Sequence, residues 1–211
     1  MTQNRSTAVM QRRVEAHDSL DDFPTPPWAT RAACEFLEAR GQQLANMSVR
    51  EPCANRGYMV RPLLESFGMV LASDIHDYGF GFPVQDYLFG PDDWQSHTDW
   101  TFMNPPFRLA AQFIQKALRL SRVGVAAVVR TAFLEGNERY ETLFSQCPPW
   151  AVAVHVERVP MVKGRVDPDA ASATSYTWIF WRTDTDERLP LDWIPRCRKR
   201  LERASDYEVA S

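Results

Sequence analysis

The chain has 211 residues, of which 45% are hydrophobic and 24% are charged, and its formal net charge at pH 7 is −3. This length suits one domain with its own core, and the composition is ordinary for a globular protein. No apolar run is long enough to span a membrane, and the polar N-terminus has no signal-peptide pattern, so no membrane partner is expected. The negative charge excludes a generally basic protein that coats nucleic acid, so any nucleic-acid site must be local.

The cysteines are scattered along the chain, with no CxxC pair and no nearby histidine cluster. They are Cys34, Cys53, Cys147 and Cys197. This pattern indicates free thiols in a reducing compartment, so that a cytoplasmic location is expected and neither a disulfide framework nor a bound metal is indicated.

Predicted helices and strands alternate along most of the chain. Residues 1–20 are polar and unpatterned and are expected to form a mobile arm. The pattern then predicts one α/β domain over 21–190 with a doubly wound sheet, followed by a basic C-terminal tail over 191–211. Strands are predicted at 48–52, 69–73, 100–103, 123–129, 152–156 and 176–181, with a brief one near 83–87, and helices at 30–40, from the turn at 54–57 to about 67, at 109–118 and at 138–145.

The stretch Asn104-Pro105-Pro106-Phe107 follows a short buried strand and carries the most specific chemistry. Strand ends of this kind lie at the ligand-binding edge of an open α/β sheet. The prolines have fixed φ and donate no N–H, so the carbonyls around them are rigid and free to accept. Together with the Asn104 side-chain oxygen they suit a planar amino group, with Phe107 as a stacking face. The alternative is an ordinary strand-ending turn.

Asn-Pro-Pro-Phe resembles the catalytic tetrapeptide of S-adenosylmethionine-dependent methyltransferases that modify the exocyclic amino group of adenine or a glutamine amide. The chain is most similar to small phage- or prophage-type adenine-N6 methyltransferases, from about residue 22 to about 182, with the matching motifs in the family order. This resemblance implies a Rossmann-like class I methyltransferase fold, with a mostly parallel seven-stranded sheet and an antiparallel last strand. It also implies S-adenosyl-L-methionine as cofactor, DNA as partner, and Asn104, Pro105, Pro106 and Phe107 as catalytic residues.

The turn after the predicted strand at 48–52 resembles the first cofactor motif of that family. It comprises Glu51, Pro52, Cys53, Ala54, Asn55, Arg56 and Gly57. Close approach of backbone to the cofactor normally requires glycine, and here Asn55 stands where the family commonly has its first glycine. Asparagine tolerates left-handed φ better than other non-glycine residues, so we expect the turn to survive. The resemblance places Glu51 near the cofactor's amino group.

Five further residues, together with Asn104, complete the cofactor site that the resemblance implies. Asp74 ends the next strand and would accept the ribose hydroxyls, with Ile75 against the adenine ring. Asp86 resembles the residue that accepts from the adenine amino group. Thr25 and Pro26, in a Thr-Pro-Pro sequence before the first helix, resemble the motif that closes over the cofactor carboxylate. Each residue also has an ordinary structural role open to it, as a cap or turn.

The residues that select the target are predicted less specifically. The loop from Pro160 to Ser175 lacks hydrophobic periodicity and offers Lys163 and Arg165 to phosphates, or is a solvated linker. The segment 130–136 is a second candidate wall of the target pocket. The basic run 196–203 would supply a nucleic-acid patch, or is a solvated helix.

Three functions are therefore open at this point. The first is methylation of adenine N6 in DNA. The second is the same chemistry on RNA adenine or on a protein glutamine, although Phe107 fits nucleic acid slightly better than protein. The third is a non-catalytic adaptor that keeps the fold and cofactor binding, with Asn55 as its one supporting feature.

Overall fold

The structure is a computed structural model that describes residues 21–90, 92, 97–189 and 191–208, so the predicted arm at 1–20 lies outside the described residues. Seven strands form one sheet in the order β2-β1-β3-β4-β6-β5-β7. Strand β6 runs antiparallel to both of its neighbours, and the other pairs are parallel. The predicted fold class is confirmed. The strands are β1 (Ser48–Glu51), β2 (Met69–Ala72), β3 (Thr98–Met103), β4 (Ser121–Arg130), β5 (Ala151–His155), β6 (Tyr176–Arg182) and β7 (Asp192–Ile194).

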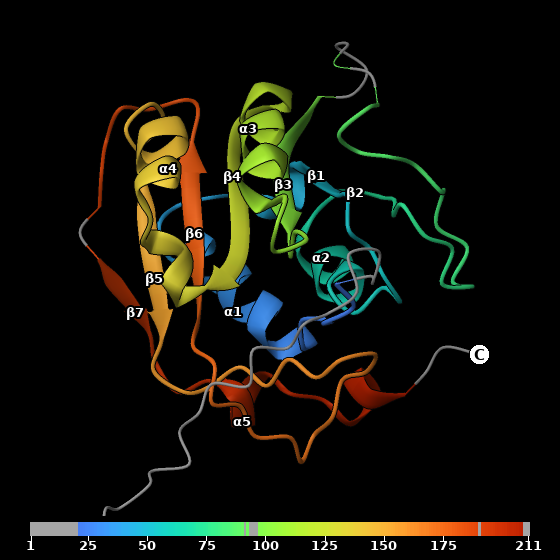
Figure 1. Cartoon of the computed structure of the whole chain (residues 1–211). Coiled ribbons are helices and arrows are strands. Elements are labelled where there is room, and N and C mark those ends of the chain that lie inside the picture. The colour runs from blue at the N-terminus through green and yellow to red at the C-terminus, as the bar shows by residue number, and fades with distance from the viewer. Residues whose placement is uncertain (1–20, 91, 93–96, 190, 209–211) are drawn as a thin grey trace, which may run out of the picture.

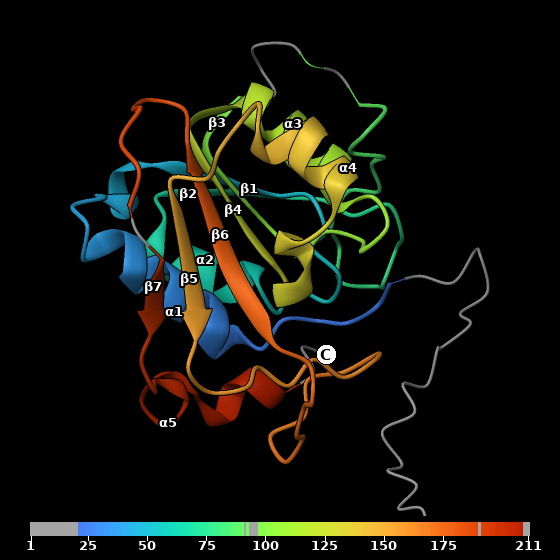
Figure 2. The same cartoon turned by 60° about the vertical axis from the view of Figure 1, so that its left-hand side comes forward.

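Helices cover both faces of this sheet (Figures 1 and 2). Helices α1 (Pro27–Glu38) and α2 (Val60–Ser66) lie on one face. Helix α3 (Ala110–Leu120) lies on the other, beside α4 (Asn137–Arg139), which continues as a π-helical turn over Tyr140–Phe144. The short helix α5 (Arg198–Leu201) lies near α1. The result is a three-layer αβα arrangement, as expected for a doubly wound sheet.

Strand β4 explains why both faces need helices. Its apolar run alternates between two cores: Ala126 and Val128 join the core beneath α1, whereas Val125, Ala127 and Val129 join the core beneath α3. Because successive side chains of a strand point to opposite faces, a continuous apolar run must be buried on both sides. The run therefore places β4 at the centre of the sheet.

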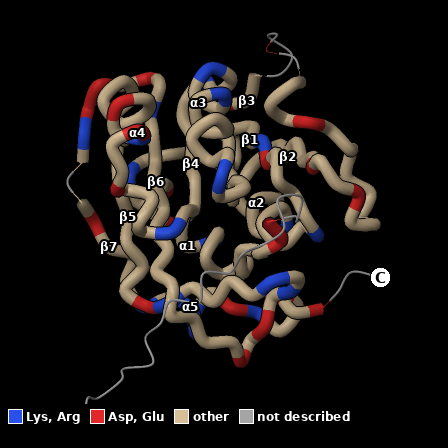
Figure 3. The backbone as a smooth tube through the Cα atoms, viewed as in Figure 1, with Lys and Arg blue, Asp and Glu red and all other residues tan. Residues whose placement is uncertain are grey.

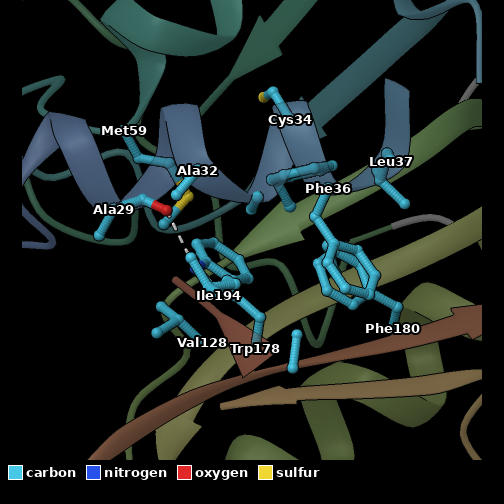
Figure 4. Packing of buried hydrophobic residues seen from close by; sticks show 14 of the residues in the cluster. Ala29, Ala32, Cys34, Phe36, Leu37, Met59, Val128, Trp178, Phe180 and Ile194 are labelled. Carbon is cyan, nitrogen blue, oxygen red and sulfur yellow. Dashed lines mark hydrogen bonds between the residues drawn. The ribbon is translucent and has the colours of Figure 1, made fainter. Parts of the chain in front are cut away.

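Aromatic packing fixes α1 on the sheet (Figure 4). The ring of Phe36 stacks on Phe180 of β6, with 4.9 Å between centroids and 7° between ring planes. The indole N–H of Trp178, also on β6, donates to the Ala29 carbonyl at 3.1 Å. These two contacts fix the position of helix α1 relative to β6.

The structure differs from the predicted elements in two places. The brief strand predicted at 83–87 is reduced to one isolated bridge between Asp74 and Val84. The segment 192–194, which falls in the predicted tail, forms β7 and pairs with β5 at the edge of the sheet. Among the described residues no helix is both long and apolar enough to cross a membrane.

Candidate active site

A cavity opens at the carboxyl ends of β1, β2 and β3, and most of the predicted site residues line it. Glu51 is the last residue of β1, Asp74 follows β2, and Asn104 follows β3 directly. This is the edge at which open α/β sheets bind ligands. The predicted residues that line the cavity are Thr25, Glu51, Pro52, Cys53, Ala54, Asn55, Asp74, Ile75, Asp86, Asn104 and Pro106.

Four predicted site residues lie outside this lining, namely Pro26, Gly57, Pro105 and Phe107. The carbonyl of Pro26 accepts from the Ala29 amide at the start of α1, so this proline has a structural position. Gly57 has a φ of 78°, and a Cβ there would come within 3.0 Å of the Phe82 ring. Gly57 therefore shapes the turn without facing its ligand.

Asn55 adopts the left-handed conformation that its position requires. Its φ is 49°, and it is the one non-glycine residue with positive φ in the described part of the chain. Its amide donates to Asp74 Oδ2 at 2.8 Å, which ties the turn after β1 to the end of β2. The tight turn therefore forms with an asparagine at its left-handed position.

The Glu51 carboxyl group is buried at the floor of the cavity. The residue is 1% exposed, and its Oε1 accepts from the Cys53 amide at 2.9 Å. Burial raises the pKa of Glu51 to about 8, because the charged form loses its hydration, while the Cys53 amide opposes this shift. A perturbed carboxyl group in a cavity is a typical property of a ligand site.

The two predicted aspartates both accept backbone hydrogen bonds. Asp74 is buried and accepts from the amides of Asn55 and His76. Asp86 is exposed, and its Oδ1 accepts from the amides of Leu88 and Phe89. Since a carboxylate has about four acceptor positions, both retain acceptor capacity toward the cavity.

The loop after Asp86 supplies a cavity residue that the sequence analysis did not identify. Phe89 lines the cavity, yet it is 89% exposed. The buried Lys116 of α3 holds this loop, with its ammonium donating to the carbonyls of Leu88 and Gly90. An exposed aromatic ring on a fixed loop offers a flat apolar surface to a ligand. Lys116 lies 28 residues after Leu88, so no local sequence pattern signals this support.

Thr25 presents an unsatisfied polar atom to the cavity. The residue is 3% exposed and lines the cavity, and its Oγ1 is buried with no hydrogen-bond partner among the described residues. Burying a hydroxyl without a partner is unfavourable, so such an atom indicates a ligand group that completes the bond. A carboxylate is well suited to accept from this hydroxyl.

Asn104 has a fixed side-chain orientation. Its Nδ2 donates to the Phe23 carbonyl at 2.7 Å. A carbonyl requires a donor, so the amide nitrogen must face Phe23 and the amide oxygen must point elsewhere. Asn104 also lines the cavity. The amide oxygen of Asn104 is therefore the atom left to accept a hydrogen bond beside the cavity.

Phe107 is held by its backbone and covered on its ring. Its amide donates to Asp21 Oδ2 at 2.8 Å. Its ring lies 5.7 Å from that of Phe23, with 34° between the planes, and the guanidinium carbon of Arg130 lies 3.9 Å from its centroid. A base can stack on the face that Arg130 covers only after this guanidinium moves.

The residues predicted to contact the target lie around the loop Asn104–Phe107. Met161 contacts Asn104, with 3.9 Å between Sδ and Nδ2, so the loop predicted to line the target entrance does approach the site. Arg165 is paired with Asp167 at 3.0 Å, which reduces its availability to a phosphate. Arg130, at the end of β4, is the first residue of the other predicted wall.

Three basic residues of the C-terminal segment have acidic partners within the molecule. Arg198 pairs with Glu202, Arg200 with Glu35 and Arg203 with Glu65. Segments of both charges accordingly lie around α5 in Figure 3. This pairing weakens the prediction that the run 196–203 forms a nucleic-acid patch.

The chain has the class I S-adenosylmethionine-dependent methyltransferase fold, as three solved structures show. A Listeria monocytogenes protein described as such a methyltransferase superposes with a TM-score of 0.64 and 12% identity, over 85% of this chain and 68% of that one. The type I restriction-modification methyltransferase subunit of Streptococcus thermophilus gives 0.62 and 12%, over 92% and 51%. A Pyrococcus horikoshii protein described as an RNA methyltransferase gives 0.57 and 16%, over 77% and 88%.

These similarities concern the fold, since all three identities are low. This chain spans about half the length of the Streptococcus subunit. No protein-family model and no curated protein sequence matches the chain. Assignment of a target must therefore rest on the site itself.

Proposed function

We propose that this protein transfers a methyl group from S-adenosyl-L-methionine to the N6 amino group of adenine in DNA. The orientation of Asn104 carries the proposal. Because Nδ2 is committed to the Phe23 carbonyl, the side-chain oxygen is the atom left for an incoming N–H. An acceptor beside a cavity in a methyltransferase fold is suited to an amino group.

The cavity residues fit this cofactor. Thr25 Oγ1 is unsatisfied and would donate to the cofactor's carboxylate. Glu51 lies where its carboxyl group would meet the amino group, and Asp74 and Asp86 would accept from ribose hydroxyls and the adenine amino group. When bound, S-adenosylmethionine supplies an electrophilic methyl group on its sulfonium.

The protein's part in the reaction is to orient the target nitrogen. The lone pair of an adenine amino group is delocalised into the ring, which makes it a poor nucleophile. Asn104 Oδ1 and the Pro105 carbonyl would accept its two hydrogens and favour a more pyramidal nitrogen. This is positioning together with charge stabilisation, without a covalent enzyme intermediate. In duplex DNA the base must leave the stack, and Arg130 must leave the face of Phe107 to receive it.

The proposal is tested by incubating the purified chain with methyl-labelled S-adenosylmethionine and unmethylated DNA, total RNA or a protein lysate. Mass spectrometry of the digested product identifies the methylated group. We expect N6-methyladenine in DNA. Label in RNA or in glutamine would keep the chemistry and change the target, and absence of label from all three would indicate an adaptor.

Asn104→Ala should lower turnover by about 100-fold or more, the usual effect of removing one oriented polar contact to a reacting group. Binding of S-adenosylhomocysteine, measured by calorimetry, should change little, because the turn proposed to bind the cofactor (residues 51–57, the cofactor turn) follows β1, whereas Asn104 follows β3. Asn46→Ala is the matched control, since Asn46 is an exposed residue just before the amino end of β1, at the opposite end of that strand from the cavity. Equal turnover in wild type and Asn104→Ala would refute the catalytic assignment.

A further inference from the structure

Residues 21–23 form a strap that contacts three separate loops of the site. Asp21 accepts from the Phe107 amide of the catalytic loop, and the Phe23 carbonyl accepts from Asn104. Between them, the Asp22 carbonyl accepts from the Gly164 amide at 2.8 Å. The Asp22 side chain is directed to the cofactor turn instead. Consecutive strap residues thus contact different loops around the cavity.

Asp22 makes a dense set of charged contacts with that turn. Its Oδ1 accepts from Asn55 Nδ2 at 2.8 Å. Both of its oxygens accept from the Arg56 guanidinium, at 2.9 and 3.0 Å, and the two side chains are 14% and 25% exposed. Charge-assisted, forked contacts of this kind define geometry more strongly than neutral ones.

Asn55 needs such support because of its backbone. A φ of 49° is available to glycine at no steric cost, whereas a residue with a Cβ adopts it less readily. The Asn55 side chain is held at both ends: Oδ1 accepts from the Arg56 amide at 2.8 Å, and Nδ2 donates to Asp22. The strap therefore stabilises the left-handed residue through its side chain.

We propose that Asp22 is a positioning residue for the cofactor turn. It holds Asn55 and Arg56 in the conformation that a glycine at position 55 would adopt without help. Cofactor affinity in this chain then depends on a carboxylate that does not line the cavity. This inference rests on the cofactor assignment above and extends it to a residue outside the family's motif.

A double-mutant cycle between positions 22 and 55 tests this proposal, with S-adenosylhomocysteine binding measured by calorimetry in the absence of any target. Asp22→Ala should weaken binding about tenfold. Asn55→Gly should stay within about twofold of wild type, because glycine takes the turn conformation unaided. The double variant should bind like Asn55→Gly, since the two residues act as one unit.

Asp184→Ala is the matched control. It removes a carboxylate that also accepts a forked contact from an arginine, Arg182, but does not line the cavity, and it should leave the S-adenosylhomocysteine affinity unchanged. Asp22→Asn keeps an acceptor for Asn55 while losing the charge toward Arg56, so it should give an intermediate loss and serves if Asp22→Ala folds poorly. The melting temperature of each variant shows whether weaker binding comes from loss of the fold or only from a change in the conformation of the cofactor turn.

Three outcomes would overturn the inference. Asp22→Ala binding as wild type, additive losses in the double variant, or a loss in Asp184→Ala as large as in Asp22→Ala would each do so. Failure of the wild type to bind S-adenosylhomocysteine would reject the cofactor assignment as well. A target other than DNA would not affect the result, because no target is present.

Discussion

At the scale of single residues, Glu51 combines a place in the cavity lining with a raised pKa. With a pKa of about 8, caused first by burial, its carboxyl group is mostly protonated at pH 7 in the free protein. A ligand ammonium group beside it would favour the charged form. Ligand binding should therefore release a proton, so that affinity depends on pH.

The affinity for S-adenosylhomocysteine should accordingly rise between pH 6 and pH 8. Glu51→Gln cannot ionise and should bind with a nearly flat pH profile, measured by calorimetry at three pH values. The stability of the free protein should change with pH in the opposite direction to the affinity. Because the folded-state pKa lies above the ordinary 4.5, the folded state binds more protons, so the Glu51 contribution to stability falls as pH rises from 4.5 to 8. An equal affinity slope in Glu51→Gln would contradict this role.

Single residues also show the limit of sequence reasoning at this site. The types and order of Glu51, Asn55, Asp74 and Asn104 predicted their gathering at one sheet edge, because strand ends of a parallel sheet meet there. Asp21 and Asp22 were not identified, since a pair of aspartates before a Pro-rich segment resembles any solvated turn. Their partners are 33 and 86 residues away, a separation that no local pattern encodes.

At the scale of elements, periodicity predicted six of the seven strands of the described sheet, including β2 at one edge, and missed β7 at the other. The run 123–129 is apolar because β4 is buried on both faces, and so it was unambiguous. Strand β7 has only three residues, and its Trp193 is 55% exposed, so the segment carries no burial pattern. It is a strand because β5 offers it an open edge, which is a tertiary property.

The end of β5 packs against α1 through a histidine that must stay neutral. His155 is 8% exposed, its ring lies edge-on to Trp28 at 5.6 Å, and neither ring nitrogen has a partner among the described residues. Burial lowers the pKa of His155 to about 4, although nearby Glu157 opposes the shift. Charging this imidazole is therefore incompatible with the packed interface.

Stability should consequently fall as the pH is lowered from 6.5 to 4. In this window the unfolded histidine binds a proton that the folded one does not, and the difference amounts to about 3 kcal/mol at most. Urea unfolding at pH 7, 6 and 5 should show a steeper decline in wild type than in His155→Leu. His76→Leu, which alters an exposed histidine, is the control and should keep the wild-type slope. A slope unchanged in His155→Leu would refute this account.

At the scale of the whole molecule, a buried ion-pair cluster joins both ends of the described chain. Arg31 of α1 donates to both oxygens of Asp206 at 2.8 Å, and it also contacts Glu65 of α2. The Arg31 and Asp206 side chains are 7% and 3% exposed. The C-terminal segment from residue 191 is thus anchored to α1 through Asp206.

Asp206→Ala should lower the free energy of unfolding by about 3 kcal/mol, because it leaves a buried guanidinium partly unpaired. Denaturant titration measures the change, and Ser205→Ala, at an exposed neighbouring position, should have little effect. A loss similar to that of the control would show that Glu65 alone suffices for Arg31. For the same reason, deleting residues 196–211 would damage the fold, and point substitutions are the better test of nucleic-acid binding by this segment.

The partners of α1 are made late in the synthesis of the chain. Asp206 follows Arg31 by 175 residues, and Trp178 follows Ala29 by 149. At a synthesis rate of roughly 5–20 residues per second, Asp206 is added to the chain about 9–35 seconds after Arg31 of α1. Strand β6, which carries Trp178 and which α1 covers, is made about 7–30 seconds after α1 by the same count, so the apolar face of α1 lacks this partner for most of the interval.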